Sequence, residues 1–225
     1  MLQESRELPA MVIMKALFLT MRETELKSQN DNFEHLKSEI LRCRECRDKF
    51  GFEPHPIVLG CTNSKIIQIS QAPSQNVHDT LKPFNDASGR KLREKWYNIS
   101  EDDFYNTENF YFTSVAHCYP GKSQNGGDRQ PPISCARKWL MREIEAVDNK
   151  IFILIGRKAA DFFFSKQDFS ELVFSDNEIK GKPAFVLPHP SPLNIKWFKD
   201  NPEFSYVRVR EVERAVHEVL NLDYK

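Results

Sequence analysis

The sequence predicts an α/β protein, a three-layer α/β/α sandwich with a four-stranded, mostly parallel central sheet. Four short apolar segments rich in β-branched or aromatic residues indicate the strands, and segments with helical spacing separate them. Strands that alternate with helices usually form a parallel sheet that is covered on both faces. The expected strands are residues 66–70 (IIQIS), 110–115 (FYFTSV), 151–155 (IFILI) and 184–187 (AFVL).

The N-terminal residues 1–31 are expected to be an extension and linker ahead of one domain, residues 32–225. Residues 8–21 are apolar, but Lys15 interrupts them and no small-residue cleavage site follows, so a signal peptide is not indicated. They predict a short amphipathic helix, or sequence upstream of the true start. The polar residues 22–31 predict a linker, and residues 32–46 predict a helix.

Further helices are expected between and after the strands. Ser100 with Asp103 resembles a capping box at a helix start, and Ser134 is expected to cap another helix. A valine stripe marks the last helix. The expected ranges are 90–96, a short helix after Ser100, about 136–147, 157–164 and about 206–220.

Composition excludes some classes of protein. The 32 basic and 32 acidic residues give zero formal net charge, so a nucleic-acid partner would require local basic patches. No stretch has the apolar length of a membrane span, and a cytoplasmic location is expected. Five cysteines in a reducing compartment do not predict a disulfide framework. Seventeen phenylalanines indicate a large aromatic core or a stacking surface.

Polar or proline-bearing loops follow three of the four expected strands. They are residues 71–75 (QAPSQ), 117–121 (HCYPG) and 188–192 (PHPSP). Crossovers of one hand place the ends of parallel strands at one edge of the sheet, where open α/β sheets bind ligands. The sequence therefore predicts that these three loops converge on a binding site.

Four cysteines have a spacing that indicates a metal site. Cys43 and Cys46 are separated by two residues in a charged stretch, Cys118 follows the second strand, and Cys135 lies near a helix start. Four thiolates can hold zinc or an iron–sulfur cluster, and the spacing does not choose between them. Cys61 stands apart and is expected to be a buried thiol. The alternative is five unrelated core cysteines, which the charged surroundings of Cys43 and Cys46 disfavour.

Together these segments resemble the uracil-DNA glycosylase superfamily, in the iron–sulfur branch usually called family 4. That branch has a GEAPG-like loop, a P-F-V-G-x-A-G stretch, a strand ending in T-N-V-V-K-C-R-P-P, a later cysteine and an H-P-S or H-P-A end to its fourth strand. The resemblance covers roughly residues 36–220. The counterparts here are residues 70–74 (SQAPS), 83–89 (PFNDASG), 113–121 (TSVAHCYPG), Cys135 and 189–191 (HPS).

The resemblance implies an enzyme that removes uracil from DNA, and a structural [4Fe–4S] cluster on Cys43, Cys46, Cys118 and Cys135. A monomer acting on uracil-containing DNA, with no membrane partner, is expected. Several motif positions differ, which makes this a divergent branch. Gln71 replaces the family's Glu, Ser114 replaces its Asn, Asp86 replaces a Gly, and Val77-His78 replaces a Glu-Asp pair.

The resemblance also implies roles for individual residues, each with a structural alternative. His189 would stabilise the leaving uracil anion, or be a structural histidine. Asp86 would position water, or cap a helix. Phe84 would stack on the flipped base, or belong to the core. The complete expected set is His189, Asp86 and Gln71 for catalysis; Phe84, Ser114, Ala72 and Pro73 for the base; and Ser191, Lys196 and Arg129 for DNA.

Three functions compete at this point. The first is a monofunctional glycosylase that hydrolyses the N-glycosidic bond of uracil and leaves an abasic site for base excision repair. The second is a catalytically weak DNA-damage-binding module that keeps the fold and the cluster, which the replaced Glu and Asn motivate. The third is a zinc-stabilised nucleotide-binding protein outside repair.

Overall fold

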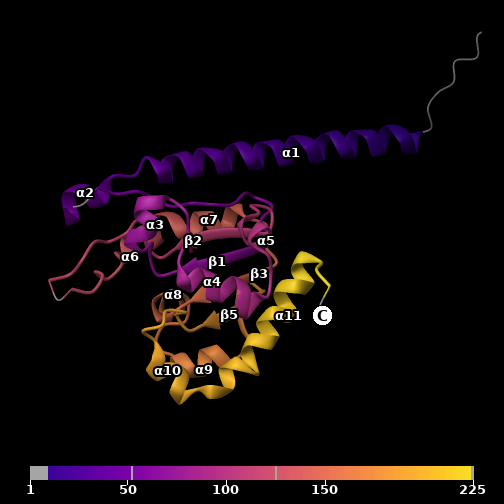
Figure 1. The fold of residues 1–225 in the computed structure, drawn as a ribbon. Helices are drawn as coiled ribbons and strands as arrows, with labels where there is room; N and C mark the ends of the chain where they lie inside the picture. Colours follow the sequence, from indigo (N-terminus) through magenta and orange to yellow (C-terminus); the bar gives the residue numbers. More distant parts are fainter. Residues whose placement is uncertain (1–9, 52, 125, 224–225) are drawn as a thin grey trace, which may run out of the picture.

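The computed structural model describes residues 10–51, 53–124 and 126–223 (Figure 1). A five-stranded sheet in the order β2-β1-β3-β5-β4 forms its centre. The strands are β1 (Ile66–Ser70), β2 (Phe110–Ser114), β3 (Ile151–Ile155), β4 (Asn177–Ile179) and β5 (Lys182–Leu187). β1 pairs in parallel with β2 and β3, and β3 pairs in parallel with β5. The α/β class and the four predicted strands are confirmed.

β4 is a fifth strand that the sequence analysis missed. It pairs antiparallel with β5 at the edge of the sheet, through a turn in which Lys180 and Gly181 both have positive φ. Positive φ at both central residues is typical of the tight hairpin turns whose twist matches that of the strands. β4 contains three residues, NEI, which are too few and too polar to give an alternating pattern.

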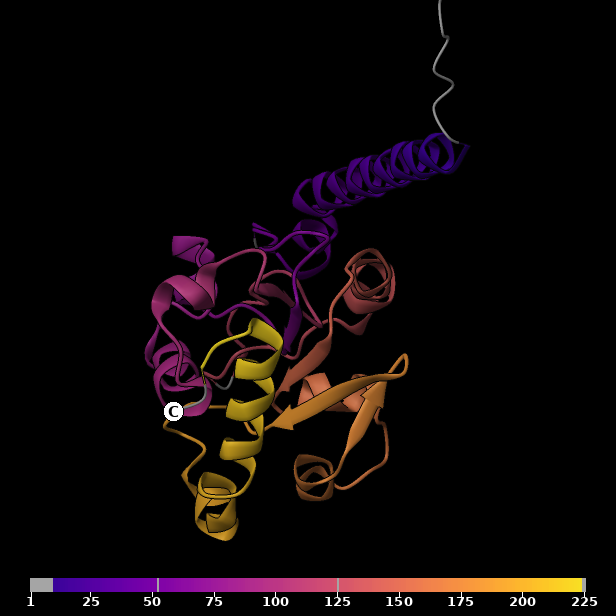
Figure 2. The same cartoon turned by 90° about the vertical axis from the view of Figure 1, so that its right-hand side faces the viewer.

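Helices flank the sheet on both sides. Figure 2 shows α11 lying along one side of the sheet, whereas α1 lies at the top of the view. The predicted cap at Ser100 is confirmed, because its hydroxyl accepts from the Asp103 N–H at 3.0 Å. The helical segments are α1 Ala10–Leu41, α2 Glu45–Phe50, α3 Gln75–Thr80, α4 Ala87–Lys91, η1 Leu92–Tyr97, α5 Glu101–Tyr105, α6 Ile133–Cys135, η2 Ala136–Leu140, α7 Met141–Ala146, α8 Arg157–Phe163, α9 Phe169–Phe174, α10 Ile195–Asp200, η3 Pro202–Ser205 and α11 Arg208–Leu220.

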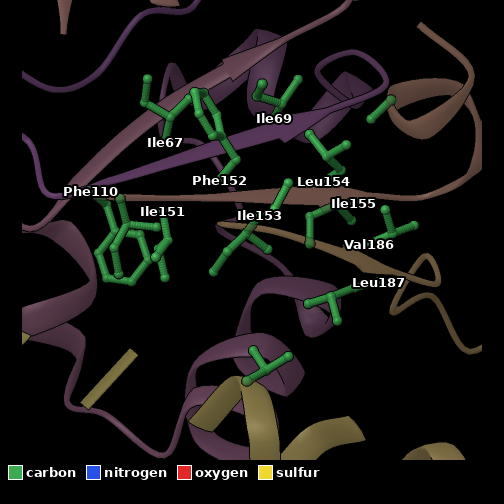
Figure 3. Close-up of a cluster of buried hydrophobic side chains, with 14 of the residues drawn as sticks. Ile67, Ile69, Phe110, Ile151, Phe152, Ile153, Leu154, Ile155, Val186 and Leu187 are labelled. Atoms are coloured by element: carbon green, nitrogen blue, oxygen red, sulfur yellow. The ribbon is translucent and has the colours of Figure 1, made fainter. Parts of the chain in front are cut away.

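The central strands carry the core. Every residue of β2 and β3 is buried, as expected for strands covered on both faces. Figure 3 shows the side chains of β3, Ile151 to Ile155, within this core. One polar residue, Gln68, lies fully buried in the middle of β1. Its Oε1 accepts a hydrogen bond from the buried Tyr97 hydroxyl at 2.7 Å. This bond connects the centre of the sheet to η1, and it satisfies polar atoms that would be costly to bury alone.

The linker predicted at residues 22–31 is wrong, because this segment lies inside the continuous 32-residue helix α1. RETELKSQND contains no Gly or Pro and has several strong helix formers, so it can continue a helix without packing. The first part of α1 projects away from the body of the molecule (Figure 1). Only its last part is anchored, by Phe33, Leu36 and Ile40, all of them buried. The division at residue 31 stays a prediction.

Two further expectations about helices are wrong. Ser134 does not cap a helix, because α6 already begins at Ile133 with Pro132 in the capping position. Only a polar loop was expected after β1, but residues 75–80 form the short helix α3, capped by the Ser74 side chain. This six-residue helix has one apolar residue, Val77, so it has no apolar periodicity that the sequence could display. No helix among the described residues is long and apolar enough to cross a membrane.

Two phenylalanines on α1 provide a test of where this helix contributes to stability. Phe33 is 2% exposed and its ring lies 5.9 Å from the Tyr111 ring, whereas Phe18 is 69% exposed. We expect Phe33→Ala to lower the free energy of unfolding by about 3–5 kcal/mol because it leaves a cavity. Phe18→Ala should change it by less than about 0.5 kcal/mol. Denaturant titration of both variants measures this, and equal losses would contradict the proposed anchoring.

Candidate functional site

Segments at the carboxyl ends of β1, β2 and β5 line one pocket. The loops after β1 and β5 meet there as predicted, but residues 117–121 do not line the pocket, and β2 contributes its last strand residues instead. The pocket has a volume of about 90 Å³. This is several times the roughly 15 Å³ that a single water requires, and it suits a small ring. Ala72 and Pro73 line it from the loop after β1, Ser114 from the end of β2, and His189 from the loop after β5. Phe84 and Asp86 complete the wall from the segment before α4.

Phe84 is held in an unusual backbone conformation. Its φ is +53°, in the left-handed region that residues with a side chain rarely adopt. The Tyr105 hydroxyl donates to the carbonyls of Pro83 and Phe84, at 3.0 and 3.2 Å. The Phe84 ring lies 5.8 Å from the Phe112 ring at the floor of the pocket. Backbone strain that the surroundings enforce in this way is typical of functional sites.

Gly89 makes this conformation possible. A Cβ atom on Gly89 would lie 1.7 Å from the Phe84 carbonyl oxygen, so any side chain there would push the Phe84 backbone away. Asp86 belongs to the same unit, because its Oδ1 accepts from the Gly89 N–H at 3.0 Å and caps α4. The structural alternative for Asp86 is therefore observed, and the same side chain also lines the pocket.

The surroundings of His189 determine which of its ring nitrogens carries the proton. Its Nδ1 accepts a hydrogen bond from the Ser191 backbone N–H at 3.2 Å, which places the proton of the neutral ring on Nε2. His189 is exposed as a whole residue, but desolvation of its ring by the surrounding groups lowers the pKa of the imidazole. The Asp86 carboxylate opposes this shift only partly. The neutral form with a proton on Nε2 therefore predominates at neutral pH.

Ser114 presents an acceptor to the pocket. Its side chain is buried, and its hydroxyl donates to the Ala116 carbonyl at 2.7 Å. Since the single hydroxyl proton is used in that bond, the lone pairs of Oγ are the groups that remain for a ligand.

Gln71 does not line this pocket but a neighbouring hollow of about 460 Å³. Its backbone carbonyl accepts from the Ala116 N–H at 3.1 Å, which ties the loops after β1 and β2 together. His189 borders both spaces, and Ser191 and Arg157 border the hollow. The hollow therefore continues the pocket along the surface.

The two basic residues predicted to contact DNA lie outside both spaces. Lys196 is exposed on α10, and its ammonium forms an ion pair with Asp200 at 2.5 Å. Arg129 is exposed in the loop after β2, where its backbone N–H donates to the Gly121 carbonyl at 2.9 Å. Ser191 lines the hollow, and its hydroxyl accepts from the Leu193 N–H at 3.2 Å.

The four predicted metal-ligating cysteines gather in one region. Burial and the nearby charges of Cys135 and Cys43 raise the pKa of the Cys46 thiol to about 11. Burial and the charges of the other three cysteines raise the pKa of Cys118 still further. Among the described residues, no group of three or more His, Cys, Asp or Glu side chains is arranged to hold a metal ion. Cys61 lies apart, with its Sγ 3.3 Å from the Thr107 carbonyl.

A buried polar cluster beside these cysteines was missed by the sequence analysis. His117 is 1% exposed and Glu143 is 0% exposed, and His117 Nε2 lies 2.7 Å from Glu143 Oε2. Burial disfavours the imidazolium, but the Glu143 carboxylate outweighs it and raises the pKa of His117 to about 10. His117 lies within the motif at residues 113–121, whereas no sequence pattern distinguishes Glu143 from the other helical residues around it.

Comparisons with known proteins agree with this geometry. A model of the uracil DNA glycosylase superfamily matches residues 57–212. A type-4 uracil-DNA glycosylase of Sulfurisphaera tokodaii is 26% identical over 153 residues, which cover 68% of this chain and 66% of that protein. One from Archaeoglobus fulgidus is 27% identical, with 68% and 72% covered, and one from Saccharolobus solfataricus is 25% identical, with 68% and 67% covered.

The chain thus matches about two thirds of the length of these relatives. The match to the family model includes every residue that lines the pocket. Since the family model spans well over half of the chain, the protein belongs to the uracil DNA glycosylase superfamily.

Proposed function

We propose that this protein is a monofunctional DNA glycosylase that flips uracil out of DNA and hydrolyses its N-glycosidic bond, leaving an abasic site. The observation that carries the proposal is His189 in the pocket wall, with its Nδ1 occupied by the Ser191 N–H. That bond leaves a neutral imidazole with an Nε2–H donor. A base inside a duplex is not accessible to an enzyme, so a pocket of this size suits an extruded base.

Phe84 and Ser114 would hold the base. The ring of Phe84 forms an apolar wall on which a flipped base can stack, and base–aromatic stacking typically contributes about 1–3 kcal/mol. Ser114 Oγ can accept the N3–H of uracil, because its own proton is donated to Ala116. Ala72 and Pro73 would complete the base-binding wall beside them.

The bond between C1′ and N1 of the nucleotide breaks as the electron pair moves to uracil, which leaves as an anion. A preorganised donor aimed at uracil O2 stabilises that anion without reorganisation, and Nε2–H of His189 is the best placed donor. Water then adds to the sugar, where positive charge develops. Asp86 would stabilise this charge and position the water with its carboxylate, although Oδ1 also caps α4.

Gln71 would support catalysis as an amide donor and not as a base, since its side chain has no ionisable group. It borders the hollow beside His189, so its action would be indirect or would depend on the bound DNA strand. Ser191 in the same hollow would hold the backbone near the abasic sugar, and the exposed Lys196 and Arg129 would meet phosphates.

Cys43, Cys46, Cys118 and Cys135 would hold a [4Fe–4S] cluster. Proximity supports this set, because Cys43 and Cys135 lie near enough to Cys46 and Cys118 to raise the pKa of both thiols, and Cys61 is not among the groups that do so. Cys43 and Cys135 pack on the same small apolar cluster of Leu36, Ile40 and Trp139. Four thiolates are the usual ligand set of such a cluster. When bound, it would tie the end of α1 to the loop after β2.

A catalytically weak damage-binding module is the second candidate. Gln71 and Ser114 replace an acid and an amide of the related motif, which favours it. The two candidates differ in one measurement, which is excision of uracil from an oligonucleotide.

We expect His189→Ala to lose on the order of 100-fold or more in single-turnover excision, because one preorganised donor is removed. DNA binding and melting temperature should stay close to normal. His189→Gln should retain part of the activity, since its amide N–H can reach near the position of Nε2. Near-normal turnover of His189→Ala would refute the role of this donor, even for an active glycosylase.

The lowered pKa of His189 predicts a direction of pH dependence. The unfolded chain protonates this imidazole near its ordinary pKa of about 6.5, whereas the folded protein does so at lower pH. The contribution to stability is therefore complete above about pH 7 and falls as the pH drops below 6.5. Imidazole ¹⁵N NMR should show the Nε2–H tautomer at neutral pH. A doubly protonated ring at pH 7 would contradict it.

Gly89→Ala should displace Phe84 and reduce excision on the order of 100-fold, because small misplacements at a reacting centre have effects of this size. Gly127→Ala is the matched control, since a Cβ atom there meets nothing within 4 Å. Excision kinetics and thermal melts of both variants measure the effect. Full activity in Gly89→Ala would show that the Phe84 conformation is dispensable.

The cluster is tested by two cysteine variants. Cys46→Ser should lose bound iron and the brown colour, and it should loosen the end of α1. Cys61→Ser should retain both, because Cys61 lies apart from the other four. Iron and sulfide analysis measures both, and loss of iron in Cys61→Ser would overturn the ligand assignment.

A further inference from the structure

Cys135 contacts His117, a residue that is not one of the four proposed cluster ligands. Its Sγ lies 3.4 Å from Nδ1 of His117, and the backbone N–H of His117 donates to the same sulfur at 3.4 Å. Both distances are within the normal range for hydrogen bonds to sulfur. One residue thus places its backbone N–H and a ring nitrogen against the same sulfur.

The other ring nitrogen of His117 faces Glu143. Nε2 lies 2.7 Å from Glu143 Oε2, and both side chains are buried. Glu143 also accepts from the Tyr111 hydroxyl at 2.7 Å and from the Thr113 hydroxyl at 3.0 Å. A buried carboxylate is stable only when several donors compensate for its lost hydration. His117 is one of three such donors, so its ring cannot rotate without leaving Glu143 undersatisfied.

Thr113 links Glu143 to the pocket. Its hydroxyl bonds to Glu143, and Thr113 is one of the residues that line the pocket wall at the end of β2. Side chains in contact therefore run without a break from Cys135 through His117 and Glu143 to Thr113. The neighbouring strand residue on this side of the pocket is Ser114, which the proposed function assigns to the base.

We propose that His117 is a positioning residue, which donates from Nδ1 to the Cys135 thiolate and joins this thiolate through Glu143 to the Thr113 wall of the base pocket. The inference rests on the proposed function, since it assumes that Cys135 is a cluster ligand. Partners that hydrogen-bond to ligands orient them and tune the metal centre, and their loss typically costs about 10–100-fold in metal affinity or activity.

Two substitutions separate the two sides of the imidazole. His117→Asn retains an amide N–H near the position of Nδ1, next to Cys135. His117→Gln retains one near the position of Nε2, next to Glu143, and removes the side-chain donor to the thiolate. His217→Gln is the matched control for changing a buried histidine, because His217 lies on α11 and contacts the carbonyls of Tyr97 and Asn98.

The readouts are the rate of iron release to a chelator and the Fe–S stretching bands in resonance Raman spectra of the purified proteins. We expect His117→Gln to release iron on the order of 10-fold faster and to shift an Fe–S band to higher frequency. His117→Asn should stay close to wild type in both readouts. His217→Gln should leave both unchanged, even if its melting temperature falls.

Unchanged release and spectra in His117→Gln would overturn the inference. So would equal losses in His117→Asn and His117→Gln without a shifted band, because the residue would then act only through packing. If His117→Gln does not fold, the unmutated protein labelled with ¹⁵N in the histidine rings serves instead. After one-electron reduction with dithionite, which makes a [4Fe–4S] cluster paramagnetic, the cluster should show a coupling to a histidine nitrogen, and absence of this coupling in the reduced protein would overturn the inference.

The proposed cluster and the proposed role of His117 would be contradicted by different results. Wild-type protein without iron would remove the proposed cluster, and the inference with it, while excision could still be measured. Wild-type protein with iron and excision, but with variants that behave like wild type, would overturn only the role of His117.

Discussion

The parallel pairing of four strands determines where the loops of the pocket begin. β1 pairs with β2 and β3, and β3 pairs with β5. In a parallel sheet the carboxyl ends of neighbouring strands lie at the same edge, so three segments far apart in the sequence meet there. The register keeps them level, since Ser70 at the end of β1 pairs with Ser114 at the end of β2. The fully apolar β3 lies between β1 and β5 and anchors this edge in the core.

Polar groups inside this framework are confined to a few satisfied positions. The Tyr97 hydroxyl bonds to Gln68 in the centre of β1, and three donors surround the Glu143 carboxylate beside β2. Each bond connects the sheet to a neighbouring segment, η1 in the first case and α7 in the second. Buried polar contacts of this kind are costly to break, so they fix the positions of the strand ends around the pocket.

The pocket also depends on a backbone that is strained at one point. Phe84 adopts a positive φ because Tyr105 holds two successive carbonyls, and because Gly89 has no Cβ atom to obstruct the chain. The same segment contains Asp86, which caps α4 with one oxygen and faces the pocket. Structural and chemical roles are therefore combined in one short segment. Asp86 caps α4 and lines the pocket at the same time, so the two roles do not exclude each other.

The sequence by itself determined the α/β class, the four main strands and the convergence of the loops after β1 and β5, because apolar runs and proline-bearing loops are local patterns. It also identified most of the pocket residues through their motifs. Only the tertiary structure decided the continuous helix α1, the edge strand β4 and the place of Gln71 outside the pocket. It alone joined Glu143 to His117, since these residues are distant in the sequence. The physical reason is that a hydrogen bond between buried side chains, or a Cβ that would collide with a carbonyl 5 residues away, depends on three-dimensional distances that no periodic pattern records.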